Sequence, residues 1–217
     1  MKMKAMKVAS AGLIAGLFLA CVAFAPAAKA DAQTLTINLC NSDLCGIAPG
    51  PYGTIALSTS GSGASEVVNV TVTMNGSFGL FDDFAFNFQN QGSSTFSGVT
   101  GVTSGWTFDT GETEDGFGSF QYELEGPNPS TQISSLSFTV QCNNGCTSVT
   151  QLTSILSSGG SGSTPFALHI KDFATSSDNN TGWGGTSSVV TPEPSSLILL
   201  GTGLLGLGAG LRRRIKA

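Results

Sequence analysis

Residues 67–74 read Val-Val-Asn-Val-Thr-Val-Thr-Met and are followed by Asn75-Gly76. Apolar and polar side chains alternate along this stretch, which is the pattern of a strand with one face in a hydrophobic core. Asn-Gly favours the tight turn of a β-hairpin, because both residues tolerate positive φ. We therefore expect the next apolar run, from Phe78 to Phe88, to return as a second strand and complete a central hairpin.

The same alternation recurs through the body of the chain, interrupted by glycine and asparagine. It predicts further strands at 34–39, 52–57, 106–109, 120–124, 136–140 and 166–170. Together with the hairpin this makes about eight strands, the number typical of a two-sheet sandwich. We predict an all-β, antiparallel, jelly-roll-like β-sandwich over residues 31–175. One short helix is expected at 148–157, and a polar linker at 176–190.

The first thirty residues have the composition of a secretory signal peptide. Lysines within residues 1–7 precede an apolar run over residues 8–25, and Ala28-Lys29-Ala30 fits a cleavage site. We expect the mature chain to start at Asp31, with the export translocon and signal peptidase as partners. A lipoprotein anchored through Cys21 is disfavoured, because a leucine stands where such signals have a small residue.

The last segment, residues 191–217, combines three features in order. Pro192-Glu193-Pro194 is followed by an uncharged stretch, Leu197 to Leu211, and then by Arg212-Arg213-Arg214. The stretch predicts a single transmembrane helix, a short one because a helix rises about 1.5 Å per residue and the hydrocarbon core is about 30 Å thick. The arginines act as a cytoplasmic membrane stop, which leaves residues 31–190 on the far side.

This order of features resembles the PEP-CTERM sorting domain of Gram-negative bacteria. The resemblance implies that an exosortase, a membrane peptidase, recognises the chain and cleaves it near Pro192 to Pro194. It also implies an inner-membrane precursor, delivery of the body to the cell surface or extracellular matrix, and a link with exopolysaccharide and biofilm. The two prolines fit this role, because they lack N–H donors and hold the motif extended.

The body has a strongly acidic charge balance. Residues 31–191 contain 13 acidic side chains and a single basic one, Lys171. Such a surface repels the phosphates of nucleic acids, and no basic patch compensates. Nucleic-acid binding is therefore excluded from the expected functions.

The cysteines of the body form two close pairs. They are Cys40 with Cys45, and Cys142 with Cys146. In an exported protein an even number of cysteines favours disulfides, and the short spacings suggest two local loops. Bridges between the two pairs remain open, as does a four-thiolate zinc site, which usually has two-residue gaps and a reducing environment.

Candidate catalytic residues are few. His169 is the only histidine, and the alternation places it on the solvent face of its strand, without a Gly-x-Ser-x-Gly elbow. Residues 201–206 match a dinucleotide-binding glycine pattern, but they lie in the apolar tail without a βαβ unit, where glycines suit helix packing. We expect no enzymatic activity and no catalytic residues.

Acidic and aromatic residues suggest the remaining sites. Glu123 and Glu125 share one strand face, and further acids crowd the loop from Asp109 to Asp115. Paired carboxylates suit glycoside hydrolysis, whereas that loop, or Asp178-Asn179-Asn180, suits a weak calcium site. Exposed aromatics would stack on sugars, but Trp106 and Trp183 are more often core residues in a β-domain.

The sequence thus predicts an exported, disulfide-bonded, non-enzymatic surface or matrix protein. Apart from the weak calcium site, no metal or other cofactor is expected. The alternatives are a secreted polysaccharide-binding module, with exopolysaccharide as its partner, and a secreted carbohydrate hydrolase.

Overall fold

The computed structural model describes residues 32–127, 133–174, 180–187 and Gly203. Ten strands form one antiparallel sheet. In spatial order they are β5 (Thr95–Thr100), β10 (Ser135–Asn143), β3 (Val67–Met74), β2 (Gly53–Ser60), β1 (Ala32–Cys40), β13 (Thr181–Thr186), β12 (Phe166–Asp172), β4 (Phe78–Phe86), β9 (Tyr122–Glu125) and β6 (Thr107–Thr110). A small second sheet consists of β11 (Ser158–Gly159), β8 (Gly118–Ser119) and β7 (Thr113–Glu114).

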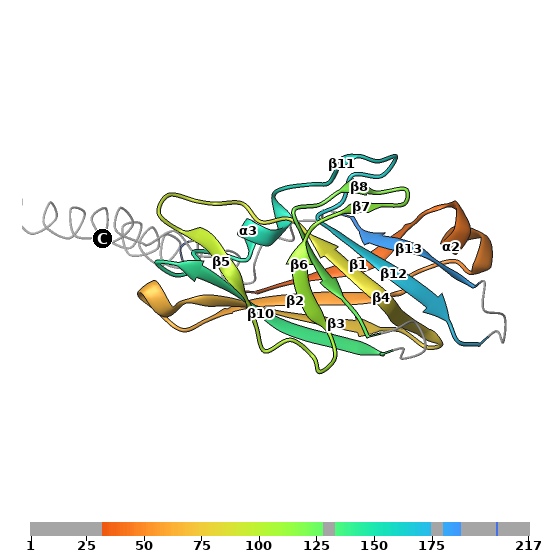
Figure 1. The fold of residues 1–217 in the computed structure, drawn as a ribbon, viewed down its shortest axis with the longest axis horizontal. Coiled ribbons are helices and arrows are strands. Elements are labelled where there is room, and N and C mark those ends of the chain that lie inside the picture. Colours follow the sequence, from red (N-terminus) through yellow and green to blue (C-terminus); the bar gives the residue numbers. More distant parts are fainter. Residues whose placement is uncertain (1–31, 128–132, 175–179, 188–202, 204–217) are drawn as a thin grey trace, which may run out of the picture.

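The large sheet folds over on itself, so that its two halves face each other across one core. The ring of Phe138 on β10 lies 5.5 Å from that of Phe84 and 5.6 Å from that of Phe86, both on β4, although β10 and β4 are far apart in the sheet order. Figure 1 shows β4 and β12 passing across β1 and β2. The predicted all-β antiparallel sandwich is confirmed, and its two layers belong to one continuous sheet.

The alternating stretch at residues 67–74 is a core strand. On β3 the side chains of Val68, Val70 and Val72 are buried, whereas Thr71 and Thr73 are exposed. Burying a valine stabilises the fold by about 1.5–3 kcal/mol relative to leaving it in water. The hydrophobic pattern therefore determines which face of β3 meets the core.

The predicted central hairpin of β3 and β4 is wrong. β3 pairs with β2 and β10, while β4 pairs with β12 and β9. The Asn75-Gly76 turn does form, with Gly76 at φ 55° and the Phe78 N–H donating to the Asn75 carbonyl. Because both edges of β3 are already paired, this turn carries the chain into the opposite layer.

Part of the predicted polar linker, 176–190, is also wrong, because Thr181–Thr186 form β13. This strand lies between β1 and β12 in the middle of the sheet. It lacks apolar alternation because its glycines leave room for neighbours: a Cβ on Gly184 would lie 2.4 Å from Cδ1 of Ile170. The close packing requires glycine at these positions, and glycine has no side chain that could contribute to the apolar alternation by which a strand is predicted.

Two short α-helices and a 3₁₀ turn at Gly63–Ser65 accompany the strands between residues 32 and 187 of the described chain. The helix expected at 148–157 is a single turn, α3 (Thr150–Thr153). The other, α2 (Ser42–Ile47), was not predicted and packs on β13. Its N-cap is Asn41, whose side chain accepts a hydrogen bond from the Leu44 N–H.

Several sequence predictions lie outside the described residues. They concern the signal peptide at 1–30 and the sorting tail at 191–217, of which only Gly203 is described. Of the helices in the described part of the chain, none has the length and apolar character needed to cross a bilayer.

Both local disulfides are present. Cys40 bonds to Cys45 and Cys142 bonds to Cys146, with Cα separations of 5.4 Å and 5.1 Å. Local pairing is confirmed, and the alternatives of cross-bridging and of a four-thiolate zinc site are wrong. Each bond fixes a short loop, one leading into α2 and the other ending β10.

Replacing Cys142 and Cys146 together by alanine should lower the free energy of unfolding by about 2 kcal/mol. A disulfide that closes so short a loop stabilises the fold by about this amount, because it reduces the conformational entropy of the unfolded chain. Both cysteines are also buried, so their replacement removes packing from the core as well. Urea unfolding of the variant and the wild type measures the difference. Non-reducing peptide mapping of the exported wild type should find Cys40, Cys45, Cys142 and Cys146 all oxidised. An unchanged urea midpoint of the variant would contradict the structural role of this bond.

Candidate functional site

A bulge between β4 and β12 brings two aspartates beside the only histidine. Phe84 pairs with Leu168 and Leu80 pairs with Ile170, so the three residues between Leu80 and Phe84 face His169 alone. A bulge bends its strand and redirects side chains. Asp82 and Asp83 therefore leave the face that carries the core.

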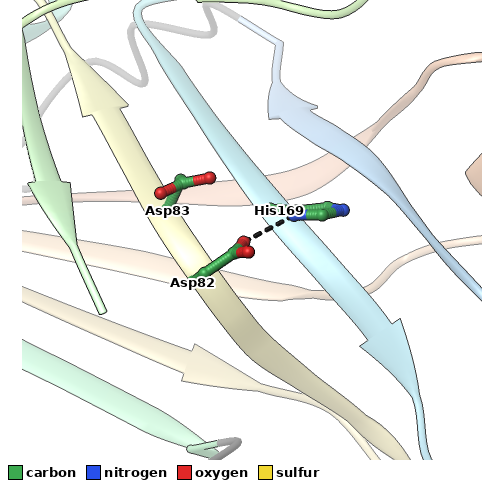
Figure 2. Close-up of side chains that lie close together, drawn as sticks. All are labelled: Asp82, Asp83 and His169. Carbon is green, nitrogen blue, oxygen red and sulfur yellow. Dashed lines mark hydrogen bonds and ion pairs between the residues drawn. The ribbon is translucent and has the colours of Figure 1, made fainter. Parts of the chain in front are cut away.

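The aspartates and the histidine form a compact group. Figure 2 shows the Asp82 carboxylate on β4 pointing toward the imidazole of His169 on β12, with Asp83 next to it. The Asp82 Oδ1 and His169 Nδ1 atoms lie 2.5 Å apart. One donor atom from each of the three side chains lies within 4.8 Å of the other two.

Two aromatic rings hold the imidazole in place. Trp183, which pairs with His169 across β12 and β13, stacks on it with ring centroids 5.1 Å apart and an angle of 8° between the planes. Phe81 meets the imidazole edge-on at 5.0 Å. The expectation of an exposed histidine is wrong, since the His169 side chain is 19% exposed.

More carboxylates come from the neighbouring strands. Asp83 pairs with Glu125 across β4 and β9, and Asp109 pairs with Glu123 across β6 and β9. Glu123 and Glu114 are each only 5% exposed. The Oε1 atom of Glu114 is buried and has no hydrogen-bond partner among the described residues.

Burial and mutual repulsion change the protonation of these acids. Burial raises the pKa of Asp83 to about 8, with further increases from Asp82 and Glu123. Burial likewise raises the pKa of Glu114 to about 8, and the charge of Glu123 adds to the shift. The pKa of Glu123 is also raised by burial, although its hydrogen bond with Asp83 opposes this. The site therefore holds protons near neutral pH.

Sequence reasoning found only part of this cluster. Among the predicted acids, Glu114 and Glu123 are buried in it, whereas Asp109 and Glu125 are exposed at its edge. Asp115 instead accepts a hydrogen bond from the Asn41 side chain. The acids opposite His169 were missed as site residues, because only the bulge brings them there.

The other expected sites have separate locations. Trp106 is a core residue, 6% exposed, and is not available for stacking on sugars. Of Asp178-Asn179-Asn180, only Asn180 is described. The predicted sorting residues, Pro192-Glu193-Pro194 and Arg212-Arg213-Arg214, lie outside the described part of the chain.

The comparison with known families decides the character of the C-terminal segment. Residues 190–214 match the family described as the PEP-CTERM protein-sorting motif. The chain carries a PEP-CTERM sorting motif. This motif makes an exosortase its processing partner and is consistent with an exported, surface-directed protein. Neither a curated protein nor a solved structure matches the chain.

Proposed function

We propose that this PEP-CTERM protein is a non-enzymatic component of the cell surface or extracellular matrix of a Gram-negative bacterium. A signal peptide directs its export, an exosortase removes its tail from an inner-membrane precursor, and the released domain associates with exopolysaccharide in a biofilm. The sorting motif at residues 190–214 carries this proposal.

The sequence spacing between domain and motif supports processing at the tail. β13 ends at Thr186, and the matched motif starts at residue 190. A cut near Pro192 to Pro194 would therefore leave every strand in the described part of the domain intact. The two disulfides also suit an oxidising compartment outside the cytoplasm.

The surroundings of His169 support a non-enzymatic role. Asp82 engages its Nδ1 atom and Trp183 covers one ring face. No hydroxyl among the described residues donates to or accepts from its imidazole. A nucleophilic mechanism needs such a hydroxyl within hydrogen-bond reach of the base.

Intact mass measurement of the surface and medium fractions tests the sorting role. Wild-type protein should end between Thr191 and Pro194. Replacing Glu193 by alanine should make full-length precursor accumulate in the inner membrane, because it changes the recognised motif without touching a described strand. Replacing Arg212, Arg213 and Arg214 together should instead let uncut precursor escape, because the membrane stop is lost.

The control is the folded state of the body, which both variants should keep, as judged by the thermal midpoint of the protein recovered. Surface protein that still ends at Ala217 in the wild type would contradict processing. The tail would then act as an anchor only.

A polysaccharide-binding module is the second candidate function, favoured by aromatic rings near the sheet edges. Phe96 and Tyr122 stack with ring centroids 4.0 Å apart, and Phe108, 37% exposed, extends the group. Aromatic faces stack on sugar rings through their apolar surface. A glycan array on the full-length protein would detect binding, while release of reducing sugar would instead indicate the hydrolase alternative.

A further inference from the structure

We propose that Asp82, Asp83 and His169 form a binding site for a divalent transition-metal ion, with Zn²⁺ as the ion that tests it. This site is independent of the sorting tail, and its three ligands lie outside the Asp109–Asp115 loop in which a calcium site was expected. It would give the domain a ligand of its own.

The geometry of the donor atoms supports coordination of a single ion. One donor atom from each residue lies within 4.8 Å of the other two. Ligand atoms of one zinc ion lie about 2.0–2.2 Å from the metal, and therefore about 3.3 Å from one another in a tetrahedral site. Coordination of one ion by all three donors would require the direct contact between Asp82 and His169 (Figure 2) to widen to about that separation.

Glu114 provides a second, independent observation. Its carboxylate is 95% buried, since only 5% of the residue is exposed, and its Oε1 atom has no hydrogen-bond partner among the described residues. It lies on β7, and the turn after β7 carries Phe117, which packs in one cluster with Ala85 of β4, Ala167 of β12 and Trp183. A buried acceptor without a donor destabilises the fold unless a cation or a proton satisfies it.

The charge distribution also points to a cation. Eight of the 13 acids of the body lie between residues 82 and 125, and the whole body has one lysine. That lysine, Lys171, has its ammonium group over the Phe81 ring at 5.3 Å. A divalent ion would offset part of the repulsion among the carboxylates that surround the site.

The imidazole decides the class of metal. Calcium and magnesium prefer oxygen ligands alone, whereas imidazole suits zinc and other transition metals. The two rings that pack on His169 restrict the orientation of the imidazole, which reduces the side-chain entropy lost when it binds a metal ion. Mixed nitrogen and oxygen donors therefore favour Zn²⁺ over Mn²⁺, and both over Ca²⁺.

Isothermal titration of the tag-free, full-length protein in mild detergent tests the proposal. Zn²⁺ should bind with one-to-one stoichiometry, more tightly than Mn²⁺, and much more tightly than Ca²⁺. Because Trp183 stacks on His169, bound zinc should also change the tryptophan fluorescence. His169→Gln and Asp82→Asn should each weaken zinc binding by more than about tenfold, since each removes a direct ligand.

Asp109→Asn is the matched control, because it removes the same charge from an exposed position on β6, which β9 separates from β4. It should change the zinc affinity by less than about threefold, as expected for a solvent-exposed charge that is not a ligand. Equal weakening by Asp109→Asn would overturn the proposal in favour of diffuse attraction. Calcium binding as tight as zinc and insensitive to His169→Gln would overturn it as well.

If either variant fails to fold, measurements on the wild-type protein alone still test the site. Absence of saturable zinc binding at micromolar concentrations, or of a zinc-dependent rise in thermal midpoint, would overturn it. Neither result bears on the sorting tail, so a negative outcome leaves the proposed function intact.

Discussion

Raising the pH from 5 to 9 in metal-free buffer is expected to destabilise the domain. Burial raises the pKa values of Asp83 and Glu114 to about 8, well above the ordinary range near 4. Between these limits the folded state binds more protons than the unfolded state, so the free energy of unfolding falls as the pH rises. The stabilisation is complete below about pH 4 and is lost through about pH 8.

The size of this effect is on the order of 2–3 kcal/mol for the two groups together. One pKa unit corresponds to about 1.4 kcal/mol, and solvent screening at the partly exposed Asp83 reduces the effect well below the sum of the two shifts. For a domain of this size the thermal midpoint should fall by about 4–10 °C. Urea unfolding at pH 5, 7 and 9 with a chelator present measures the slope.

Glu114→Gln separates this cause from general charge repulsion. The amide cannot ionise, so the variant should lose a large part of the pH dependence and be more stable than the wild type at pH 9. Asp109→Asn, at an exposed position, should keep the wild-type slope. Stability that stays constant or rises between pH 5 and 9 would contradict the burial of protonated carboxyls.

The strands that the sequence predicted correctly are those whose own side chains carry the signal. β3, β10 and β12 alternate or are continuously apolar, and all three lie in the core. Their burial follows from residues within the strand, so a local pattern is sufficient. Which strands become neighbours depends on the whole sheet, and the β3–β4 hairpin was wrong for that reason.

The sequence did not predict β13, because the residues that explain its composition belong to other segments of the chain. Its glycines are required by Leu44, Ile170 and Phe117, which approach its backbone from α2, β12 and the small sheet. Read alone, Thr181–Thr186 is a polar, glycine-rich stretch and predicts a linker. The same strand carries Trp183, so the sequence also did not predict that this ring stacks on His169.

The candidate site shows the same limit. The loop acids and the pair on β9 were recognised, because carboxylates gather there in sequence. Asp82 and Asp83 were assigned only to a strand, and strict alternation would have placed them on opposite faces. The bulge places both opposite His169, and no residue in the run predicts it.

Replacing Gly182 by alanine is expected to destabilise the domain by about 3 kcal/mol. The new Cβ would lie 2.5 Å from the Leu44 backbone nitrogen and 2.9 Å from the Asn41 Oδ1 atom. That oxygen accepts hydrogen bonds from the N–H groups of Leu44 and Trp183, so α2 and β13 would have to separate. Overpacking against backbone usually reduces stability by about 1–3 kcal/mol, and the lost cap adds about 1 kcal/mol.

Gly46→Ala is the matched control, because it makes the same chemical change within α2 with nothing within 4 Å of the new Cβ. Alanine favours a helix over glycine by up to about 1 kcal/mol, so this variant should equal or exceed the wild type. Urea midpoints of both variants measure the contrast. A Gly182→Ala protein as stable as the wild type would mean that β13 does not pack under α2, and the position of Trp183 on His169 would then lose its support.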